Sequence, residues 1–332
     1  MNSSEKLFSI VVPVYFNEEN LPETIPNLLA LQQLLPGYGL ELVFIDDGSG
    51  DNSLKILLDF QKQYPDIIQI VKLTRNFGAE TATQVGLLYA KGNCVGIIAA
   101  DLQDPPELFL DMIKHWEKGS RVVFGVRQDR EDGFFPKMFS NIYYYLVRKF
   151  AIANYPKGGI GISLIDRQVV NEVNKIMEKN SSIHPLICWL GYKPAFISYI
   201  RRSRKKGKSR WTLQKKIKLF VDTFVSFSYL PLRLFSVIGL LLALGAFIYA
   251  CYVIYGWLRF GIIVQGWFSI ILILTITSGV QMTMLGILGE YLWRTLEETR
   301  KRPHFVVDSI FPNTSFENQD SENNQTEISN CR

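Results

Sequence analysis

Two long stretches without a charged residue constrain most strongly what this chain can fold into. Leu234–Leu258 spans 25 uncharged residues and Phe260–Gly289 spans 30, with Arg259 between them. At about 1.5 Å of rise per residue, a helix of either length exceeds the roughly 30 Å hydrocarbon core of a bilayer. We therefore expect two transmembrane helices within residues 232–292, which argues against a purely soluble protein.

Basic residues flank this region on both sides. Arg201–Lys218 holds ten basic residues and no acidic one, and further basic residues follow the second stretch at Arg294 and Arg300–Arg302. Because the cytoplasmic flanks of membrane spans are enriched in Lys and Arg, we expect both termini in the cytoplasm. Residues 211–231 place apolar side chains at helical spacing among lysines, which predicts an amphipathic helix on the membrane surface.

Residues 293–332 form a polar tail after the second uncharged stretch. Pro303–Arg332 has five acidic residues, one basic residue and many Asn and Ser residues. A segment of this composition buries too little apolar surface to fold alone. We therefore expect Pro303–Arg332 to be a disordered cytoplasmic extension.

Residues 1–210 alternate β-rich apolar runs with stretches of helical spacing. Strands are expected at Phe8–Val14, Glu41–Ile45, Ile67–Leu73, Cys94–Ala99 and Val122–Gly125. Helices are expected between them at Leu21–Leu35, Leu54–Gln63, Ala79–Lys91 and Glu107–Lys118. Strands separated by helices of this length form βαβ units, so we predict an α/β domain with a mostly parallel, Rossmann-like sheet.

A polar motif follows each of the five predicted strands. These motifs are Asn17-Glu18, Asp46-Asp47, Arg75-Asn76, Asp101-Leu102-Gln103-Asp104 and Arg127. In such a sheet, ligands bind beyond the carboxyl ends of the strands, so these side chains are predicted to line one site. Asp101 and Gln103 supply the oxygen ligands that Mg²⁺ or Mn²⁺ prefers. The alternative is that the acids only cap the helices that follow them.

The order of these motifs along the chain is more specific than any one of them. Four blocks occur in order: Val12-Pro13-Val14-Tyr15-Phe16-Asn17-Glu18, Ile45-Asp46-Asp47-Gly48-Ser49-Gly50-Asp51, Arg75-Asn76-Phe77-Gly78 and Ala100-Asp101-Leu102-Gln103-Asp104-Pro105-Pro106. Over about residues 8–300 the chain resembles the inverting family 2 glycosyltransferases of the GT-A fold, and among them the dolichol- and polyprenyl-phosphate sugar synthases. With its two predicted spans and interface helix, it is most similar to bacterial polyprenyl-phosphate glucosyltransferases of O-antigen glucosylation.

The resemblance assigns roles to individual residues. It implies a nucleotide-binding set made up of Pro13, Tyr15, Asn17, Glu18, Asp46, Asp47 and Arg75. It implies a metal site at Asp101 and Gln103, and an acceptor-phosphate site made up of Arg127, Lys137, Ser140, Arg204, Ser209 and Arg210. Catalysis is expected to depend on Asp101, Arg127, Lys137 and Arg204. The chain departs from the family at Ala99 and Gly161, where acids are common.

The activity that the resemblance implies is the transfer of one hexose from UDP-glucose to undecaprenyl phosphate, or a similar polyprenyl phosphate, with Mg²⁺ or Mn²⁺ as cofactor. We expect a homo-oligomer in the bacterial plasma membrane with its catalytic domain in the cytoplasm. Gly207 stands where processive synthases carry Gln, which favours transfer of a single sugar. The basic run abuts a predicted span, which argues against nucleic acid as a partner.

Two alternatives stay open from the sequence. One is a different donor, either GDP-mannose or a UDP-linked amino sugar. The other is a non-catalytic scaffold or lipid-translocation partner built on a degenerate transferase domain, which Ala99 and Gly161 favour and which Asp101, Gln103 and Arg127 oppose.

Overall fold

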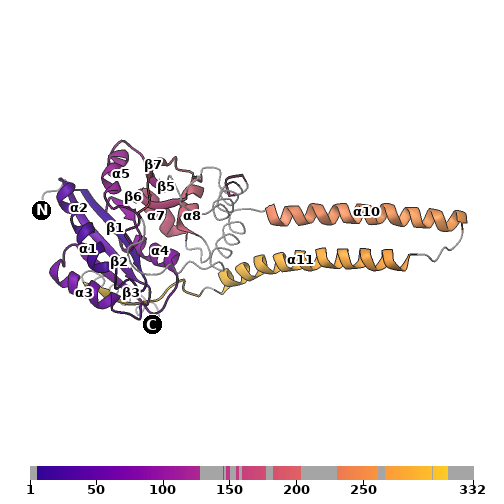
Figure 1. The fold of residues 1–332 in the computed structure, drawn as a ribbon, viewed down its shortest axis with the longest axis horizontal. Helices are drawn as coiled ribbons and strands as arrows, with labels where there is room; N and C mark the ends of the chain where they lie inside the picture. The colour runs from indigo at the N-terminus through magenta and orange to yellow at the C-terminus, as the bar shows by residue number, and fades with distance from the viewer. Residues whose placement is uncertain are drawn as a thin grey trace, which may run out of the picture. The chain divides into compact units, whose positions relative to one another are not determined.

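The computed structural model describes residues 6–127, 145, 147–149, 155–156, 159–176, 182–202, 230–260, 266–300 and 302–312. The chain divides into two compact units (Figure 1). The first unit is Met1–Lys216 together with Pro303–Arg332, and the second is Ile217–Arg302.

The first unit is built on an eight-stranded sheet in the order β7-β5-β6-β4-β1-β2-β3-β8. Its strands are β1 (Lys6–Val14), β2 (Tyr38–Asp46), β3 (Ile68–Leu73), β4 (Cys94–Ile97), β5 (Val122–Arg127), β6 (Ile160–Asp166), β7 (Ala195–Tyr199) and β8 (Val307–Phe311). The five strands expected from the sequence are present, and the sheet is mostly parallel. Strand β6 runs antiparallel to β4 and β5, and β8 runs antiparallel to β3. The other six strands therefore end at one edge of the sheet, which we call the carboxyl edge.

The helices of the first unit pack against this sheet. They are α1 (Leu21–Leu29), α2 (Leu31–Leu34), α3 (Ser53–Gln63), α4 (Ala79–Tyr89), α5 (Leu108–Glu117), α7 (Arg167–Lys175) and α8 (Ile183–Trp189). The single helix expected over Leu21–Leu35 is divided in two, because α1 ends before Ala30 and α2 begins after it.

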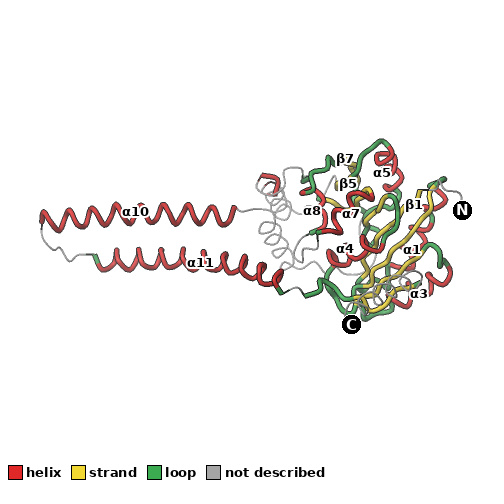
Figure 2. The backbone as a smooth tube through the Cα atoms, turned by 180° about the vertical axis from the view of Figure 1, so that it is seen from behind, coloured by secondary structure: helices red, strands yellow, loops and turns green. Residues whose placement is uncertain are grey.

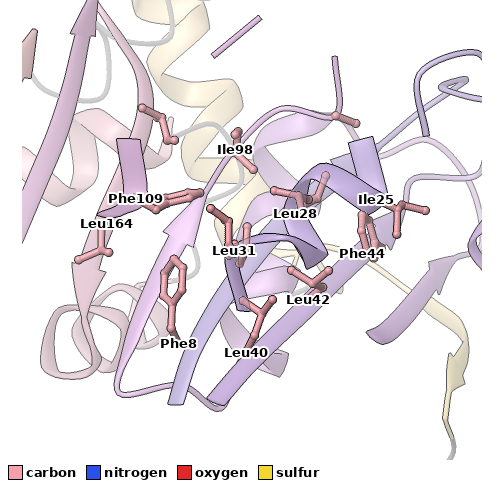
Figure 3. Packing of buried hydrophobic residues seen from close by; sticks show 14 of the residues in the cluster. Phe8, Ile25, Leu28, Leu31, Leu40, Leu42, Phe44, Ile98, Phe109 and Leu164 are labelled. Atoms are coloured by element: carbon pink, nitrogen blue, oxygen red, sulfur yellow. The ribbon is translucent and has the colours of Figure 1, made fainter. Parts of the chain in front are cut away.

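The central strand β1 is buried on both of its faces. On one face, Phe8 packs in a cluster with Ile25 of α1 and with Phe109 of α5, whose ring centroid lies 5.2 Å away (Figure 3). On the other face, a Cβ atom added to Gly86 of α4 would lie 2.1 Å from Val11 Cγ1, so α4 lies directly on the strand. Cover on both faces explains why the strand is a nearly continuous apolar run rather than an alternating one.

The structure contradicts part of the disorder expected for Pro303–Arg332. Val307–Phe311 forms β8, which pairs with β3 through Ile70–Phe311, Val71–Ile310 and Leu73–Val307. An open sheet edge leaves backbone N–H and C=O groups unpaired, and β8 covers that edge of β3. The prediction of disorder over Pro303–Arg332 is therefore wrong for this strand, whose apolar residues are outweighed in the average by the polar residues after it. Residues 313–332 lie outside the described structure.

The second unit consists, in its described part, of two long helices, α10 (Leu230–Phe260) and α11 (Trp267–Thr299). They contact each other and run side by side (Figure 2). Many of their large apolar side chains are exposed, including Leu240, Phe247, Leu274 and Leu285. Within the described helices, Ile273–Glu297 is long and apolar enough to cross a membrane, and Val237–Tyr249 is a shorter apolar stretch. The interface helix predicted at 211–231 falls, up to residue 229, outside the described residues.

Candidate functional site

The loops after β1 and β2 are hydrogen-bonded to each other at the carboxyl edge. The backbone N–H of Phe16 donates to Ser49 Oγ (3.1 Å), and that of Asn17 donates to Ser53 Oγ (2.8 Å). The Glu18 carboxylate accepts from the backbone N–H (2.9 Å) and the side-chain amide (3.0 Å) of Asn52. Glu18, which the resemblance assigns to nucleotide binding, is therefore engaged within the protein.

Asp46 is the last residue of β2 and Asp47 follows it, and the two side chains differ in their hydrogen-bond partners. Asp47 accepts from the backbone N–H groups of Phe77 (2.7 Å) and Gly78 (2.9 Å), so it fixes the loop directly before α4. Asp46 Oδ1 accepts from the Ser49 N–H (3.2 Å), whereas Asp46 Oδ2 is buried without a hydrogen-bond partner in the described structure. Burial raises the pKa of both carboxyl groups. A buried acceptor without a donor lowers the stability of the fold. Asp46 is therefore the one of the two acids that can accept a hydrogen bond from a ligand.

The loop Arg75–Gly78 after β3 packs on the turn that contains Gly48. A Cβ atom at Gly48 would lie 2.7 Å from the carbonyl carbon of Arg75, and Gly48 has a φ of +68°. Only glycine meets both conditions without strain. The Arg75 guanidinium stacks on the Phe77 ring, 4.4 Å from its centroid. Arg75 is thereby held at the same edge as Asp46.

The turn after β4 brings Asp101 and Gln103 together. Leu102 has a φ of +52°, and the Gln103 N–H donates to Asp101 Oδ1 (3.3 Å). Gln103 Oε1 accepts from Arg201 Nη2 (2.7 Å), and the Gln103 carbonyl accepts from the Arg202 N–H (2.9 Å). The segment that follows β7 is therefore bonded to this turn.

The turn Asp101–Asp104 offers few ligands to a metal ion. No group of three or more His, Cys, Asp or Glu side chains capable of holding a metal occurs among the residues that the structure describes. Asp101 offers one carboxylate and Gln103 one amide oxygen, which already accepts from Arg201. This pair fits a divalent cation that takes most of its ligands from substrate phosphates, and it does not form a closed protein cage.

Asp104, the next residue, is the centre of a buried charged cluster. Its side chain is 1% exposed and accepts from the Tyr199 hydroxyl and from Arg127 Nη2 (3.3 Å). Arg127 Nε donates to the Tyr199 hydroxyl (3.3 Å), and Arg201 Nε lies 3.8 Å from Asp104 Oδ1. Burial of the Arg127 guanidinium acts to lower its pKa, but Asp104 and Tyr199 outweigh this and raise it. Arg127 is thus held as a cation, with 16% of its side chain exposed.

Gly161, where the family commonly carries Asp, lies against this cluster. A Cβ atom at Gly161 would lie 2.0 Å from Tyr199 Oη and 2.8 Å from Arg127 Nε. The space that a side chain at residue 161 would need is therefore filled by Tyr199 and Arg127.

The structure thus places the described candidates along the carboxyl edge. They lie either among the last residues of the strands or in the loops after them: Pro13, Tyr15, Asn17, Glu18, Asp46, Asp47, Arg75, Asp101, Gln103 and Arg127. Five candidates lie outside the described residues: Lys137, Ser140, Arg204, Ser209 and Arg210. The sequence-based assignment missed Asp104, Tyr199 and Arg201. Asp104 and Arg201 belong to motifs already noted, whereas nothing near Tyr199 in the sequence points to its role.

Comparison with known proteins identifies the family of this chain. The model of the family "Glycosyl transferase family 2" matches residues 9–172. The chain is 37% identical to "Uncharacterized glycosyltransferase YkcC" of Bacillus subtilis (strain 168), over 92% of this chain and 94% of that protein. The chain belongs to glycosyltransferase family 2, and it is a transferase of the mixed α/β, GT-A-like type.

A second relative has a name that states a more specific activity. The chain is 33% identical to "Prophage bactoprenol glucosyl transferase homolog" of Escherichia coli (strain K12), over 91% of this chain and 98% of that protein. Among solved structures, it is similar to a mannosyltransferase from Pyrobaculum calidifontis in complex with GDP-Man and Mn²⁺, with a TM-score of 0.45, 15% identity and 88% of each chain covered.

Proposed function

We propose that this glycosyltransferase moves one hexose, glucose, from UDP-glucose to undecaprenyl phosphate or a similar polyprenyl phosphate. The names of its relatives support both the sugar and the lipid, because bactoprenol glucosyl transferases are 33% identical over nine-tenths of the chain or more. The reaction takes place at the cytoplasmic face of a bacterial plasma membrane, in which α10 and α11 anchor the protein.

The observation that carries the proposal is the arrangement of opposite charges around the turn Asp101–Asp104. Arg201 donates to Gln103 on this turn, and Arg127 donates to Asp104, with 2.7 and 3.3 Å between the bonded atoms. A donor diphosphate with its divalent cation suits the Asp101 side, and a lipid monophosphate suits the guanidinium side. Arg204 and Lys137, from segments outside the described residues, are proposed to add to the cationic side.

The donor nucleotide is proposed to occupy the loops after β1, β2 and β3. Asp46 Oδ2 is the buried acceptor that lacks a donor, and a nucleobase N–H supplies one. Arg75, stacked on Phe77, faces the nucleotide as a cation, and Pro13, Tyr15 and Asn17 complete the proposed set. Glu18 and Asp47 contribute indirectly, because their carboxylates fix the loops on which the others stand.

The chemistry requires no general base from the protein. The acceptor phosphate oxygen is already anionic at neutral pH and attacks C1 of the sugar directly. The bond between C1 and the β-phosphate oxygen breaks, UDP leaves with the electron pair, and the configuration at C1 inverts. A bound Mg²⁺ or Mn²⁺ supplies positive charge beside the leaving diphosphate. The chain's own part is to position the two substrates and to stabilise charge through Arg127, and by this mechanism an acid at residue 161 is not required.

The test is a donor screen with the purified full-length protein in lipid nanodiscs that contain undecaprenyl phosphate. UDP-glucose, GDP-mannose and a UDP-linked amino sugar are supplied in turn, and lipid-linked sugar is extracted and measured. We expect product with UDP-glucose, strongly reduced product with the Asp101→Asn variant, and none with excess EDTA. Product with only another donor would correct the sugar, whereas no product with any donor would favour the scaffold alternative. Full activity of both Asp101→Asn and EDTA-treated protein would remove the metal from the proposal.

A further inference from the structure

The segment Pro303–Phe311, which we call the C-terminal strap, is bonded to β3 and to α4. Beyond the paired residues of β8, the backbone N–H of Thr74 donates to the Val306 carbonyl (3.1 Å). A hydrogen bond also joins Thr81 Oγ1 of α4 to His304 Nε2 (3.0 Å). Thr74 and Thr81 stand on either side of the loop Arg75–Gly78, so the strap is bonded to both flanks of this loop.

The same loop is bonded on its other side to the end of β2. Asp47 accepts from two of its backbone N–H groups, at Phe77 and Gly78, and Gly48 lets the backbone of Arg75 approach closely. The loop therefore has two supports, one from the Asp46–Ser49 turn and one from the strap. Removing the strap leaves the flanks at Thr74 and Thr81 without their partners.

A third contact connects the strap to the surroundings of Asp46. Lys72 Nζ lies 2.6 Å from Asp308 Oδ2 of the strap. Lys72 is also the register partner of Asp46 on β2, and its charge acts to lower the pKa of that carboxyl group. Because the Lys72–Asp308 pair is about one-third to two-fifths exposed, it contributes little stability by itself. The Lys72 ammonium group thus interacts electrostatically with a carboxylate on each neighbouring strand, Asp308 and Asp46.

We propose that the C-terminal strap positions the loop Arg75–Gly78 for the nucleotide of the donor, with His304, Val306 and Asp308 as positioning residues. This rests on the proposed function, which assigns Arg75 and Asp46 to nucleotide binding. Among the described contacts, those of the strap with Thr74, Thr81 and Lys72 lie next to the loop Arg75–Gly78 or to Asp46. The effect of the strap is therefore on binding of the donor and not on the acceptor.

Two truncated proteins test the strap, each purified in nanodiscs as the wild type is. One ends at Arg302 and lacks the strap, and the matched control ends at Pro312 and keeps it. We expect the first to raise the KM for UDP-glucose about tenfold or more, since small misplacements of binding groups have effects of this size. The KM for undecaprenyl phosphate should change less than about twofold in the same protein. The control should match the wild type, and a synthetic peptide of residues 303–312 should restore donor KM to the shorter protein.

Amide hydrogen exchange provides a readout that does not depend on turnover. Without the strap, exchange at Phe77 and Gly78 should become faster, while exchange in α5 stays unchanged, and the double variant His304→Ala/Asp308→Ala should show a smaller change in the same direction. If the wild type makes no lipid-linked sugar, the proposed function fails, but the exchange experiment still decides whether the strap supports the loop. Unchanged donor KM and unchanged exchange in the shorter protein would overturn the inference. Equal losses for both substrates with faster exchange throughout the sheet would also overturn it, because the strap would then only stabilise the fold.

Discussion

At the scale of single residues, two buried aspartates near the same edge show opposite ways of satisfying a carboxylate. Asp104 is surrounded by the Tyr199 hydroxyl and the Arg127 guanidinium, which leaves its charge paired within the protein. Asp46 has one backbone donor and one buried oxygen without a partner, and burial raises its pKa. The first arrangement fixes a neighbouring cation, whereas the second leaves a place for a ligand to donate.

The first prediction concerns Asp46. Asp46→Asn keeps an oxygen for the Ser49 N–H and places an NH₂ group where the unpartnered oxygen lies. We expect the KM for UDP-glucose to rise roughly tenfold to a hundredfold, as for loss of a hydrogen bond to a charged group, with the KM for the lipid phosphate unchanged. Steady-state kinetics with each substrate varied in turn measures this, and Asp66→Asn, at an exposed position, serves as the control. Equal donor KM values in both variants would exclude Asp46 from nucleotide binding.

The second prediction concerns the contact between Gly161 and Tyr199. Gly161→Ala places a methyl group 2.0 Å from the present position of Tyr199 Oη, so the hydroxyl must move away from Asp104 and Arg127. We expect weaker use of undecaprenyl phosphate with donor KM little changed, because Arg127 loses its fixed orientation.

A double-mutant cycle distinguishes this contact from a general packing defect. Tyr199→Phe removes the hydroxyl that the new methyl group would meet. The double variant Gly161→Ala/Tyr199→Phe should therefore lose less than the sum of the two single variants, although Arg127 Nε, 2.8 Å from the new Cβ atom, still has to move. Purely additive losses would show that residues 161 and 199 do not act through each other.

At the scale of elements, α4 joins several parts of the catalytic unit. Asp47 accepts from the N–H of Gly78 directly before its first turn, and Gly86 lets the helix lie on β1. Glu80 accepts from the backbone N–H of Ile183 at the start of α8 (2.9 Å). Helix α8 in turn places His184 next to Ser163 of β6, with 3.4 Å between His184 Nε2 and Ser163 Oγ. Helices α4 and α8 and strand β6 are thus joined by polar side chains, of which Glu80 and His184 are titratable.

The third prediction concerns the pH dependence of stability through His184. Burial, with a smaller effect of Arg127, lowers the pKa of His184 to about 4 from an ordinary value of 6.5. Between pH 4 and pH 6.5, His184 is therefore protonated in the unfolded chain and neutral in the folded chain. The contribution of His184 to stability is present above pH 6.5 and falls as the pH drops toward 4, by roughly 3 kcal/mol in total.

The measurement is the thermal midpoint of unfolding of the wild type and of His184→Gln between pH 7.5 and pH 4. Burial raises the pKa of Asp46, Asp47 and Glu80, which acts in the opposite direction, so only the difference between the two proteins isolates His184. We expect the wild type to lose stability relative to the variant as the pH falls. Parallel curves for the two proteins would contradict this assignment.

At the scale of the whole molecule, charge is concentrated in one segment of the chain. The net charge is +5, and Arg201–Lys218 alone carries ten basic side chains, which leaves −5 for the rest. A basic segment directly before a long apolar helix favours the cytoplasmic side of a membrane, where anionic lipids add to the attraction. Together with the basic residues after α11, this supports the proposed orientation of both termini.

The fourth prediction is the labelling pattern of introduced and native cysteines. In a Cys251→Ser background, Gly266→Cys lies between α10 and α11 and should react with an impermeant thiol reagent added to intact spheroplasts. The native Cys331 near the chain end should react only after the cells are permeabilised. Labelling is read by gel shift of the purified protein. Reaction of Cys331 in intact spheroplasts, with protection at residue 266, would reverse the proposed topology.

The sequence by itself determined the elements of the catalytic unit and most of one side of its site. Apolar runs such as Phe8–Val14 and the polar motifs directly after them are local features. A buried parallel strand and the loop at its end are consecutive in the sequence, so a short stretch of residues is enough to predict both. This is why the sequence predicts Asp46, Arg75 and Asp101 at or just after the ends of strands, and the structure places these three residues there.

Only the tertiary structure decided which distant residues meet. Strand β6 lies between β4 and β5 in antiparallel orientation, and this brings Gly161 against Tyr199 and Arg127. Tyr199 bonds to Asp104, 95 residues earlier, and Lys72 bonds to Asp308, 236 residues later. The physical reason is that strand order and packing depend on burial of the whole sheet and on the need to cover its open edges. A local sequence pattern does not predict either of these. The strap that flanks the Arg75 loop is a short apolar segment at the start of a polar tail, and only its pairing with β3 identifies it as a structural element.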